Sequence, residues 1–353
     1  MQFLLSLTES VAILGFIPIK IFYNFTESYY ICTCGIRDYT QKSQIFIMIN
    51  RDLIRIKVVQ LVYSYYQNPD KSMASVEKEL LFSLSKSYDM YRYLLMLIGK
   101  VYEYGVKDIS VQKARAERLH LDVEIDTRYA DNKFAKQLVT NKELCSFANN
   151  AGADMMDETL IRKLYKAVKE SDAYREYMSL KSPEYADDRT FWRKVYKSCF
   201  IPCEDIDSLF EEKGLYWNDD REIVDTFVIK TIKRFKEENG EEQPLLPEYD
   251  SEEDREFAKK LIHNTLANEE EYRAMIRDNA KNWKFSRMAL MDIVIMQIAI
   301  AEIMSFPTIP PIVSINEYLD LAKVYSTPKS HVYINGLLDF VVKKLRSENV
   351  IMK

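Results

Sequence analysis

Apolar residues recur every three or four positions along much of this chain, which is the spacing of one face of an α-helix. Asn50 stands just before the first such stretch, where its side chain can cap a helix that runs to about Tyr66. Residues 68–70 have a turn sequence, and helical spacing resumes over residues 73–104. The pattern therefore predicts two consecutive helices, followed by further helices over residues 158–169 and 222–238.

The strongest apolar signal lies between residues 288 and 304, where Asp292, Gln297 and Glu302 are the only polar side chains. A stretch that is apolar on all sides predicts a helix buried by its neighbours. It is too short, and too often interrupted by polar residues, to cross a bilayer. We therefore expect this helix at the centre of a packed bundle without membrane contact.

Short connections follow this predicted central helix. Prolines at positions 307, 310 and 311 end it. Ser314 and Glu317 match a capping box, which predicts that the next helix opens there. Thr327 and Pro328 can start the last helix, because proline suits the first helical turn. The predicted fold class is all-α.

Glycine is scarce, with 8 among 353 residues, or about 2% against about 7% in ordinary proteins. No three glycines form GxGxxG and no pair forms GxxxxGK, so the phosphate-cradling loops of Rossmann and P-loop sites are absent from the sequence. Helix interiors disfavour glycine, so the scarcity also favours a helical chain. Nucleotide chemistry through such loops is excluded, and we expect no cofactor.

Five cysteines occur without the regular pattern of a disulfide framework, which is typical of a protein from a reducing cytosol. Cys199 and Cys203 are close in sequence, but no second Cys or His pair has the spacing that would complete a zinc site. The three histidines lie far apart and match no metal-binding motif. The sequence thus predicts a cytoplasmic protein without a metal centre.

The net charge of −5 is an average over unlike regions. Residues 48–118 contain 12 basic and 8 acidic residues, and residues 281–353 contain 9 and 6. Residues 119–280 contain 25 basic and 37 acidic residues, so the middle of the chain is strongly acidic. By themselves such differences are typical of solvated surface. Two prolines within residues 240–251 indicate a linker after this acidic region.

Three C-terminal motifs, in order, resemble those of the NusB family of transcription antitermination factors. They are NAKNWKFSRM at residues 279–288, PPIVSINEYLDLAK at residues 310–323 and SHVYINGLLD at residues 330–339. Towards the front, Arg51, Arg55, Gln60 and Tyr63 have the spacing of the family's arginine-rich first helix. The resemblance covers residues 49–67 and 252–347, a minority of the chain.

The resemblance implies an all-α, NusB-like helical bundle that carries a large helical insertion and has no catalytic role. It implies binding of boxA RNA beside a small-subunit ribosomal protein that acts as NusE, within the RNA polymerase antitermination complex. Recognition of single-stranded RNA needs basic groups and stacking faces rather than a catalytic pocket, which agrees with the exclusions above.

By position, the resemblance assigns roles to five residues. The expected RNA contacts are Arg51, Arg55 and Tyr333, of which Tyr333 stacks on a base, and the expected partner contacts are Tyr63 and Glu302. Lys329 is a further expected RNA contact, although it stands where the family has an acidic residue. Residues 52–54 depart from the family, because an arginine cluster is usual there and the sequence is Asp-Leu-Ile. Each missing phosphate contact weakens RNA binding and lowers its salt dependence.

We expect four segments along the chain. Residues 1–47 are an upstream extension that is non-native or disordered, because the family's first helix starts close to its initiator and Met48 fits that start. Residues 48–104 supply the first helices of the bundle, residues 105–250 the acidic insertion and linker, and residues 251–353 the rest of the bundle. Two alternatives are a non-catalytic helical adaptor and a helical RNA-binding module related to ribosomal RNA methyltransferases.

Overall fold

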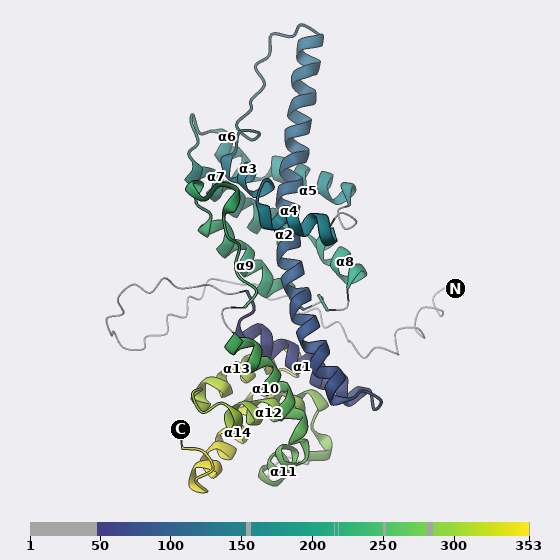
Figure 1. Cartoon of the computed structure of the whole chain (residues 1–353), viewed down its shortest axis with the longest axis vertical. Helices are drawn as coiled ribbons and strands as arrows, with labels where there is room; N and C mark the ends of the chain where they lie inside the picture. The colour runs from purple at the N-terminus through teal and green to yellow at the C-terminus, as the bar shows by residue number, and fades with distance from the viewer. Residues whose placement is uncertain are drawn as a thin grey trace, which may run out of the picture. The chain divides into compact units, whose positions relative to one another are not determined.

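The computed structural model describes residues 48–152, 157–214, 216–217, 219–249, 252–280 and 285–352, so the predicted upstream extension lies outside the described residues. Every regular element in the described part is helical, which confirms the all-α class (Figure 1). No helix found there is both long and apolar enough to traverse a lipid bilayer. The α-helices are α1 (Arg51–Gln67), α2 (Met73–Arg118), α3 (Lys133–Val139), α4 (Lys142–Phe147), α5 (Glu158–Glu170), α6 (Asp172–Met178), α7 (Tyr185–Val195), α8 (Glu204–Lys213), α9 (Arg221–Arg234), α10 (Glu252–Ala267), α11 (Glu269–Asn279), α12 (Leu290–Ser305), α13 (Pro311–Tyr325) and α14 (Ser330–Ser347).

The chain divides into two compact units. The described part of unit 1 consists of Val58–Glu77 and residues 260–352, and that of unit 2 consists of residues 48–57 and Lys78–Lys259. The divisions fall inside α1, α2 and α10. Unit 1 holds most of the C-terminal motif region, and unit 2 holds the acidic middle of the chain.

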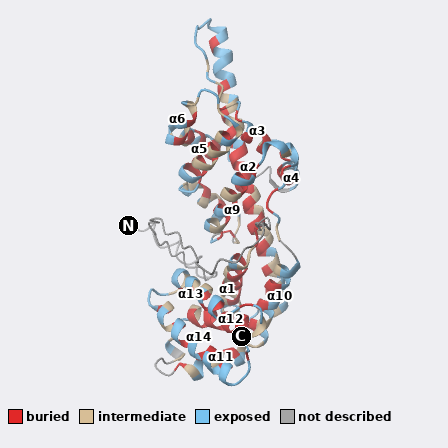
Figure 2. Ribbon diagram, turned by 90° about the vertical axis from the view of Figure 1, so that its left-hand side faces the viewer, coloured by how far each residue is buried: buried red, intermediate tan, exposed pale blue. Residues whose placement is uncertain are grey.

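Unit 1 is built around α12, which packs against α11, α13 and α14. Every residue of α12 from Asp292 to Ile303 is buried, which confirms the helix buried on all sides (Figure 2). The isoleucine-rich surface of α12 gives each neighbouring helix an apolar face to cover, and its burial supplies the main stabilising term of this unit. The three polar residues of α12, Asp292, Gln297 and Glu302, are buried with it and therefore need hydrogen-bond partners.

The helix starts show where local signals hold and where they fail. The Leu53 amide donates to the side-chain oxygen of Asn50 at 3.0 Å, which confirms the predicted cap of α1. The predicted capping box at Ser314 is wrong, because α13 already begins at Pro311 and Ser314 lies inside it. Proline at the first turn lacks only an amide that would have no partner there, so it starts the helix well.

The second helix is longer than its pattern predicted, because α2 continues past residue 104 to Arg118. Gly105 does not end α2. Because this residue has no side chain, the Tyr129 and Tyr165 rings can pack against the helix backbone, where an added Cβ would lie 2.4 Å from Tyr129 and 2.5 Å from Tyr165. α2 ends where the Leu121 amide donates to the Ala116 carbonyl at 2.9 Å, with His120 at a φ of 48° between them. This geometry is that of a Schellman cap.

Unit 2 has an aromatic core between α2 and the shorter helices. The Tyr129 ring lies 5.8 Å from Tyr102 and 5.9 Å from Trp192, measured between ring centroids. The segment predicted to be a linker also packs here, because Leu246 is buried and its amide donates to the Tyr91 hydroxyl at 3.1 Å. Within unit 2 this segment is therefore fixed to α2.

Candidate functional site

Glu302, expected to face a protein partner, lies inside unit 1 with a side chain that is 0% exposed. Its carboxylate accepts hydrogen bonds from Ser314 Oγ at 2.8 Å and from the Tyr318 hydroxyl at 2.9 Å. Both donors belong to α13, so Glu302 fixes α13 against α12. Contact with a partner through this carboxylate would require these bonds to break, and that role stays a prediction.

The start of α14 is joined to the start of α12 through Asp292. The Tyr333 hydroxyl donates to one carboxylate oxygen of Asp292, and Ser326 Oγ donates to the other. Burial, followed by the bond to Asp292, raises the pKa of the Tyr333 phenol, so this group stays neutral at physiological pH. The hydroxyl therefore points inward, while the ring is partly exposed at the surface.

Lys329 lies one helical turn before Tyr333 and is exposed at the N-terminal end of α14. In the described part of the chain its ammonium forms no ion pair. The first turn of a helix carries partial positive charge, which adds to the charge of this lysine. Lys329 and Tyr333 thus lie four positions apart at the N-terminal end of α14, as an exposed cation and a partly exposed aromatic residue.

Tyr63 lies on the part of α1 that belongs to unit 1, with a partly exposed side chain. No hydrogen bond to its hydroxyl is found among the described residues. One turn further along α1, Tyr66 is used internally, since it exchanges hydrogen bonds with Gln297 of α12 at 2.7 and 3.0 Å. Tyr66 is therefore bonded inside unit 1, whereas the Tyr63 hydroxyl has no hydrogen-bond partner among the described residues.

The two arginines of α1 lie in unit 2, and each is paired with a carboxylate. Arg51 is 43% exposed and its guanidinium lies 3.5 Å from Asp254. The Arg55 side chain is only 5% exposed and bonds Asp52 at 3.2 Å. Both guanidinium groups lie over the ring of Phe257, at 5.0 and 5.8 Å from its centroid. A phosphate can reach Arg51 from solvent, whereas Arg55 is nearly enclosed.

Lys57, the third cation of α1, forms a buried ion pair that the sequence pattern did not reveal. Its ammonium lies 2.7 Å from Asp220, and the two side chains are 2% and 0% exposed. The same ammonium donates to the Tyr216 carbonyl at 2.6 Å, and Ser87 Oγ donates to the other oxygen of Asp220. Lys57 and Asp220 are 163 positions apart, so no local signal connects them. All three cations of α1 are therefore paired with carboxylates within unit 2.

No group of three or more metal-binding side chains occurs among the residues that the structure describes. Cys199 is buried, Cys203 is partly exposed, and both are free thiols. Burial raises the pKa of the Cys199 thiol, which makes it a poor nucleophile and a poor ligand. Trp283, part of the first C-terminal motif, lies outside the described residues.

The chain is similar to known proteins over its C-terminal part. The model of the NusB family matches residues 225–343. The transcription antitermination protein NusB of Salinibacter ruber is 31% identical over 132 residues, which cover 36% of this chain and 82% of the relative. That of Geotalea daltonii is 32% identical over 133 residues, or 38% of this chain and 89% of the relative. The chain belongs to the NusB family.

Other NusB proteins are matched over a smaller share of their length. The one from Chloroherpeton thalassium is 39% identical over 99 residues, which cover 28% of this chain and 47% of the relative, so the chain spans about half of it. No solved structure matches the chain. The family resemblance is thus confirmed. This NusB chain is a long form, and most of unit 2 lies outside the matched residues.

Proposed function

We propose that this NusB chain is a non-catalytic, RNA-binding transcription antitermination factor. It binds boxA RNA together with a small-subunit ribosomal protein acting as NusE, in the cytoplasm, within the RNA polymerase antitermination complex. The proposal rests on membership of a family whose relatives are named transcription antitermination proteins. The observation that carries it to particular residues is the exposed Lys329 four positions before the partly exposed Tyr333 at the start of α14.

Tyr333 suits base stacking because its orientation is fixed from inside. Its hydroxyl is held by Asp292, so the ring does not need to be ordered when RNA arrives. Stacking of a base on an aromatic ring is worth about 1–3 kcal/mol. Lys329, one turn earlier on the same face, attracts a phosphate of the same RNA segment. Recognition at this surface therefore needs no movement of α14.

The arginines of α1 contribute unequally to the proposed RNA binding. Arg51 contacts a phosphate, but the phosphate has to displace the Asp254 carboxylate from its 3.5 Å contact. Arg55 shares the Phe257 ring with Arg51 and remains paired with Asp52. We therefore expect weaker RNA binding by this helix than an open arginine cluster would give, and a smaller salt dependence.

The protein partner uses the Tyr63 side of α1. A partly exposed tyrosine offers a ring to bury and a hydroxyl to bond, a combination that is enriched at protein interfaces. Glu302 acts as a positioning residue in this proposal, because it keeps α13 in place through Ser314 and Tyr318. Tyr63→Ala should then weaken partner binding and leave the binding of RNA alone unchanged.

A second candidate function, a helical adaptor without RNA affinity, is favoured by one observation. All three cations of α1 are already paired with carboxylates. Titration of boxA RNA into the full chain, with and without the ribosomal protein, separates the two functions. The adaptor predicts no preference for boxA over a scrambled RNA in either condition, and that result would exclude the proposed function.

Variants of Tyr333 test the site itself. Tyr333→Ala removes the stacking face and should weaken boxA binding about fivefold to a hundredfold. Tyr333→Phe keeps the ring and should bind RNA within about twofold of the wild-type chain. Phe340→Ala is the matched control, because it removes an exposed ring from the same helix, two turns away. Equal losses in the Tyr333→Ala and Phe340→Ala variants would contradict stacking at Tyr333.

A further inference from the structure

The end of α2 and the segment that follows it form a protruding arm, defined here as residues 106–127. Only Ile109 and Ala116 are buried within it. Figure 1 shows this part of α2 extending beyond the short helices of unit 2, and in Figure 2 the same part is mostly pale blue. A helix end with so few buried side chains adds little to the core of unit 2, so its length calls for another explanation.

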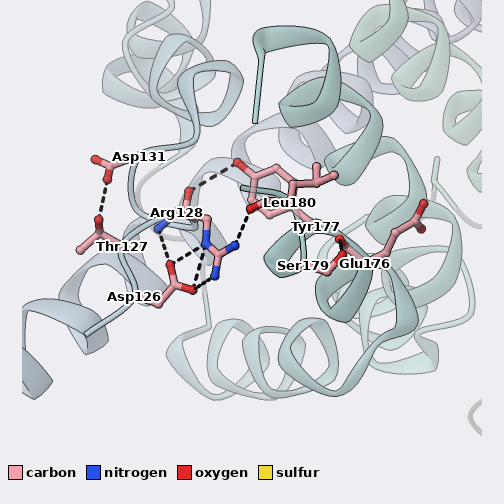
Figure 3. A network of polar contacts seen from close by, with 8 residues as sticks. All are labelled: Asp126, Thr127, Arg128, Asp131, Glu176, Tyr177, Ser179 and Leu180. Atoms are coloured by element: carbon pink, nitrogen blue, oxygen red, sulfur yellow. Dashed lines mark hydrogen bonds and ion pairs between the residues drawn. The ribbon is translucent and has the colours of Figure 1, made fainter. Parts of the chain in front are cut away.

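The arm is firmly attached at its base. On the helical side, Gly105 lets the Tyr129 and Tyr165 rings pack directly on the backbone of α2. On the returning side, Arg128 bonds Asp126 at 2.9 and 3.0 Å and donates to the Leu180 carbonyl (Figure 3). The bond to Arg128 lowers the pKa of Asp126, so this pair stays charged at neutral pH. The base thus holds the arm in a defined direction from unit 2.

One face of the arm's helix is cationic. At 100° per residue, Lys107, Val111, Arg115 and Arg118 fall within about 80° of one another, along about 16 Å of helix. All four side chains are exposed. Ile109 and Ala116 lie on the opposite side of the helix, where the Leu121 amide bonds the Ala116 carbonyl. The cationic face therefore points away from the returning segment and its acidic residues.

Carboxylates do not neutralise this face. Among the described residues, Lys107, Arg115 and Arg118 form no ion pair. Asp108, at the edge of this face, accepts bonds from the Tyr165 hydroxyl at 3.0 Å and from Gln112 at 2.9 Å, and the cation nearest to it is Lys169 of α5 at 3.9 Å. The cations of α1, by contrast, are all paired with carboxylates. A phosphate would have to displace a carboxylate on α1, whereas it would displace none on the cationic face of the arm.

We propose that this face of the arm is a second RNA contact, which binds backbone phosphates outside the boxA element. The inference rests on the proposed RNA-binding function and adds to it a place where the acidic unit can still hold RNA. Over most of unit 2 a phosphate meets net negative charge, but screening in physiological salt limits this repulsion to about 8 Å. A stripe about 16 Å long on a protruding arm has its far end outside that range.

RNA fits the face better than an acidic protein segment does. The side chains between the three cations are Val111 and Ala114, which form too small an apolar surface to hold a protein helix, and the exposed Leu119, Leu121 and Val123 follow the last cation of the face. Guanidinium groups at positions 115 and 118 are one turn apart and can contact neighbouring phosphates. Contacts of this kind carry no base specificity, so the arm raises affinity for RNA of any sequence next to boxA.

The test compares two RNAs, a boxA element alone and a boxA element flanked on both sides by about twenty nucleotides. For single strands, each lost phosphate contact lowers the slope of log affinity against log salt by about 0.7. Arg115→Ala/Arg118→Ala should therefore lower the slope for the flanked RNA by about 1.4 and leave the slope for boxA alone unchanged. Between 50 and 200 mM salt, the wild-type affinity should fall about sevenfold more than that of the variant.

The matched control is Arg162→Ala/Arg193→Ala, which removes two arginines of unit 2 outside the arm. This control should bind both RNAs like the wild-type chain. If the arm variant and the control bind flanked RNA equally well while wild-type boxA binding is intact, the arm inference is wrong and the proposed function stands. If the wild-type chain binds neither RNA, both are wrong. If the arm variant binds both RNAs like the wild-type chain but no longer binds the ribosomal protein, the arm is a protein-docking surface and the inference is overturned.

Discussion

Units 1 and 2 solve the burial of polar groups in different ways. In unit 1, the polar residues of α12 are satisfied by neutral donors, as when Ser314 and Tyr318 bond Glu302. Unit 2 also buries Asp188 with neutral donors, the Tyr177 hydroxyl and the Lys133 amide, but it adds charge pairs, as when Lys57 pairs with Asp220 inside the protein. In a buried ion pair, the free energy of removing two ions from water offsets most of their attraction, so the pair adds little net stability. Removing one partner is strongly destabilising, because the other charge stays buried alone.

The difference is visible within one helix, because α1 is divided between the two units. The part of α1 in unit 1 contributes Val58, Val59 and Val62 to an apolar core. The part in unit 2 contributes cations that are held by carboxylates of unit 2, including Asp220 and Asp254. The cations of α1 are thereby paired within unit 2, whereas Lys329, Arg115 and Arg118 form no ion pair among the described residues.

The largest effect is expected from breaking the buried pair. Asp220→Asn leaves the Lys57 ammonium buried without a counter-charge and should lower the free energy of unfolding of unit 2 by about 3–5 kcal/mol. Hydrogen exchange in α9 measures this. Lys57→Met/Asp220→Asn removes the isolated charge and should restore most of the stability. A double variant as unstable as Asp220→Asn would show that charge is not the cause.

Crowding at Gly105 should give the next largest effect. Gly105→Ala places a methyl group within 2.5 Å of two aromatic rings, which have to move apart. Overpacking of this kind costs about 1–3 kcal/mol. Thermal unfolding followed by the fluorescence of buried Trp192 measures the loss in unit 2. An unchanged midpoint would mean that the rings shift freely and that the base of the arm is looser than the contacts indicate.

A moderate effect on RNA binding is expected at Asp254. Asp254→Asn removes the carboxylate that competes with phosphate for Arg51 and should raise boxA affinity about threefold to fivefold, since a partly exposed pair is worth up to about 1 kcal/mol. Glu256→Gln is the control on the same helix, because Glu256 pairs with Lys259 instead. If both variants bind boxA equally, Asp254 does not restrict Arg51.

The smallest effect on stability is expected at Gly336 of unit 1. Gly336 lies within α14, and an added Cβ there meets nothing within 4 Å. Gly336→Ala should therefore stabilise unit 1 by about 0.5–1 kcal/mol, because alanine loses less conformational entropy in a helix. Hydrogen exchange in α14 measures it. The opposite signs expected at Gly105 and Gly336 separate a glycine needed for packing from one that packing does not need.

Much of the fold could be predicted from local patterns. The cap at Asn50 and the buried helix between residues 288 and 304 were both found where expected. The extension of α2 was missed because Gly105 looks like a helix breaker until the rings beside it are known. The capping box at Ser314 was misplaced because its hydroxyl serves Glu302, an interaction between two helices.

The candidate site could be predicted only in part. Lys329 is the N-cap of α14 and Tyr333 lies in its first turns, so their nearness in sequence already placed both at one helix start. The burial of Arg55 and the use of Glu302 inside unit 1 depend on side chains brought from other helices. Arg115 and Arg118 belong to no sequence motif, and only the exposure of the arm indicates that a ligand could reach them.

The sequence by itself determined the helical class, the central helix of unit 1 and the membership of the NusB family, because periodicity and motifs are properties of neighbouring positions. Only the tertiary structure decided which cations are available. Coulomb interactions depend on distance in space and not on separation along the chain. Lys57 is therefore neutralised by Asp220, a residue far away in sequence. Arg115 and Arg118 remain available because the fold holds their face of α2 away from carboxylates.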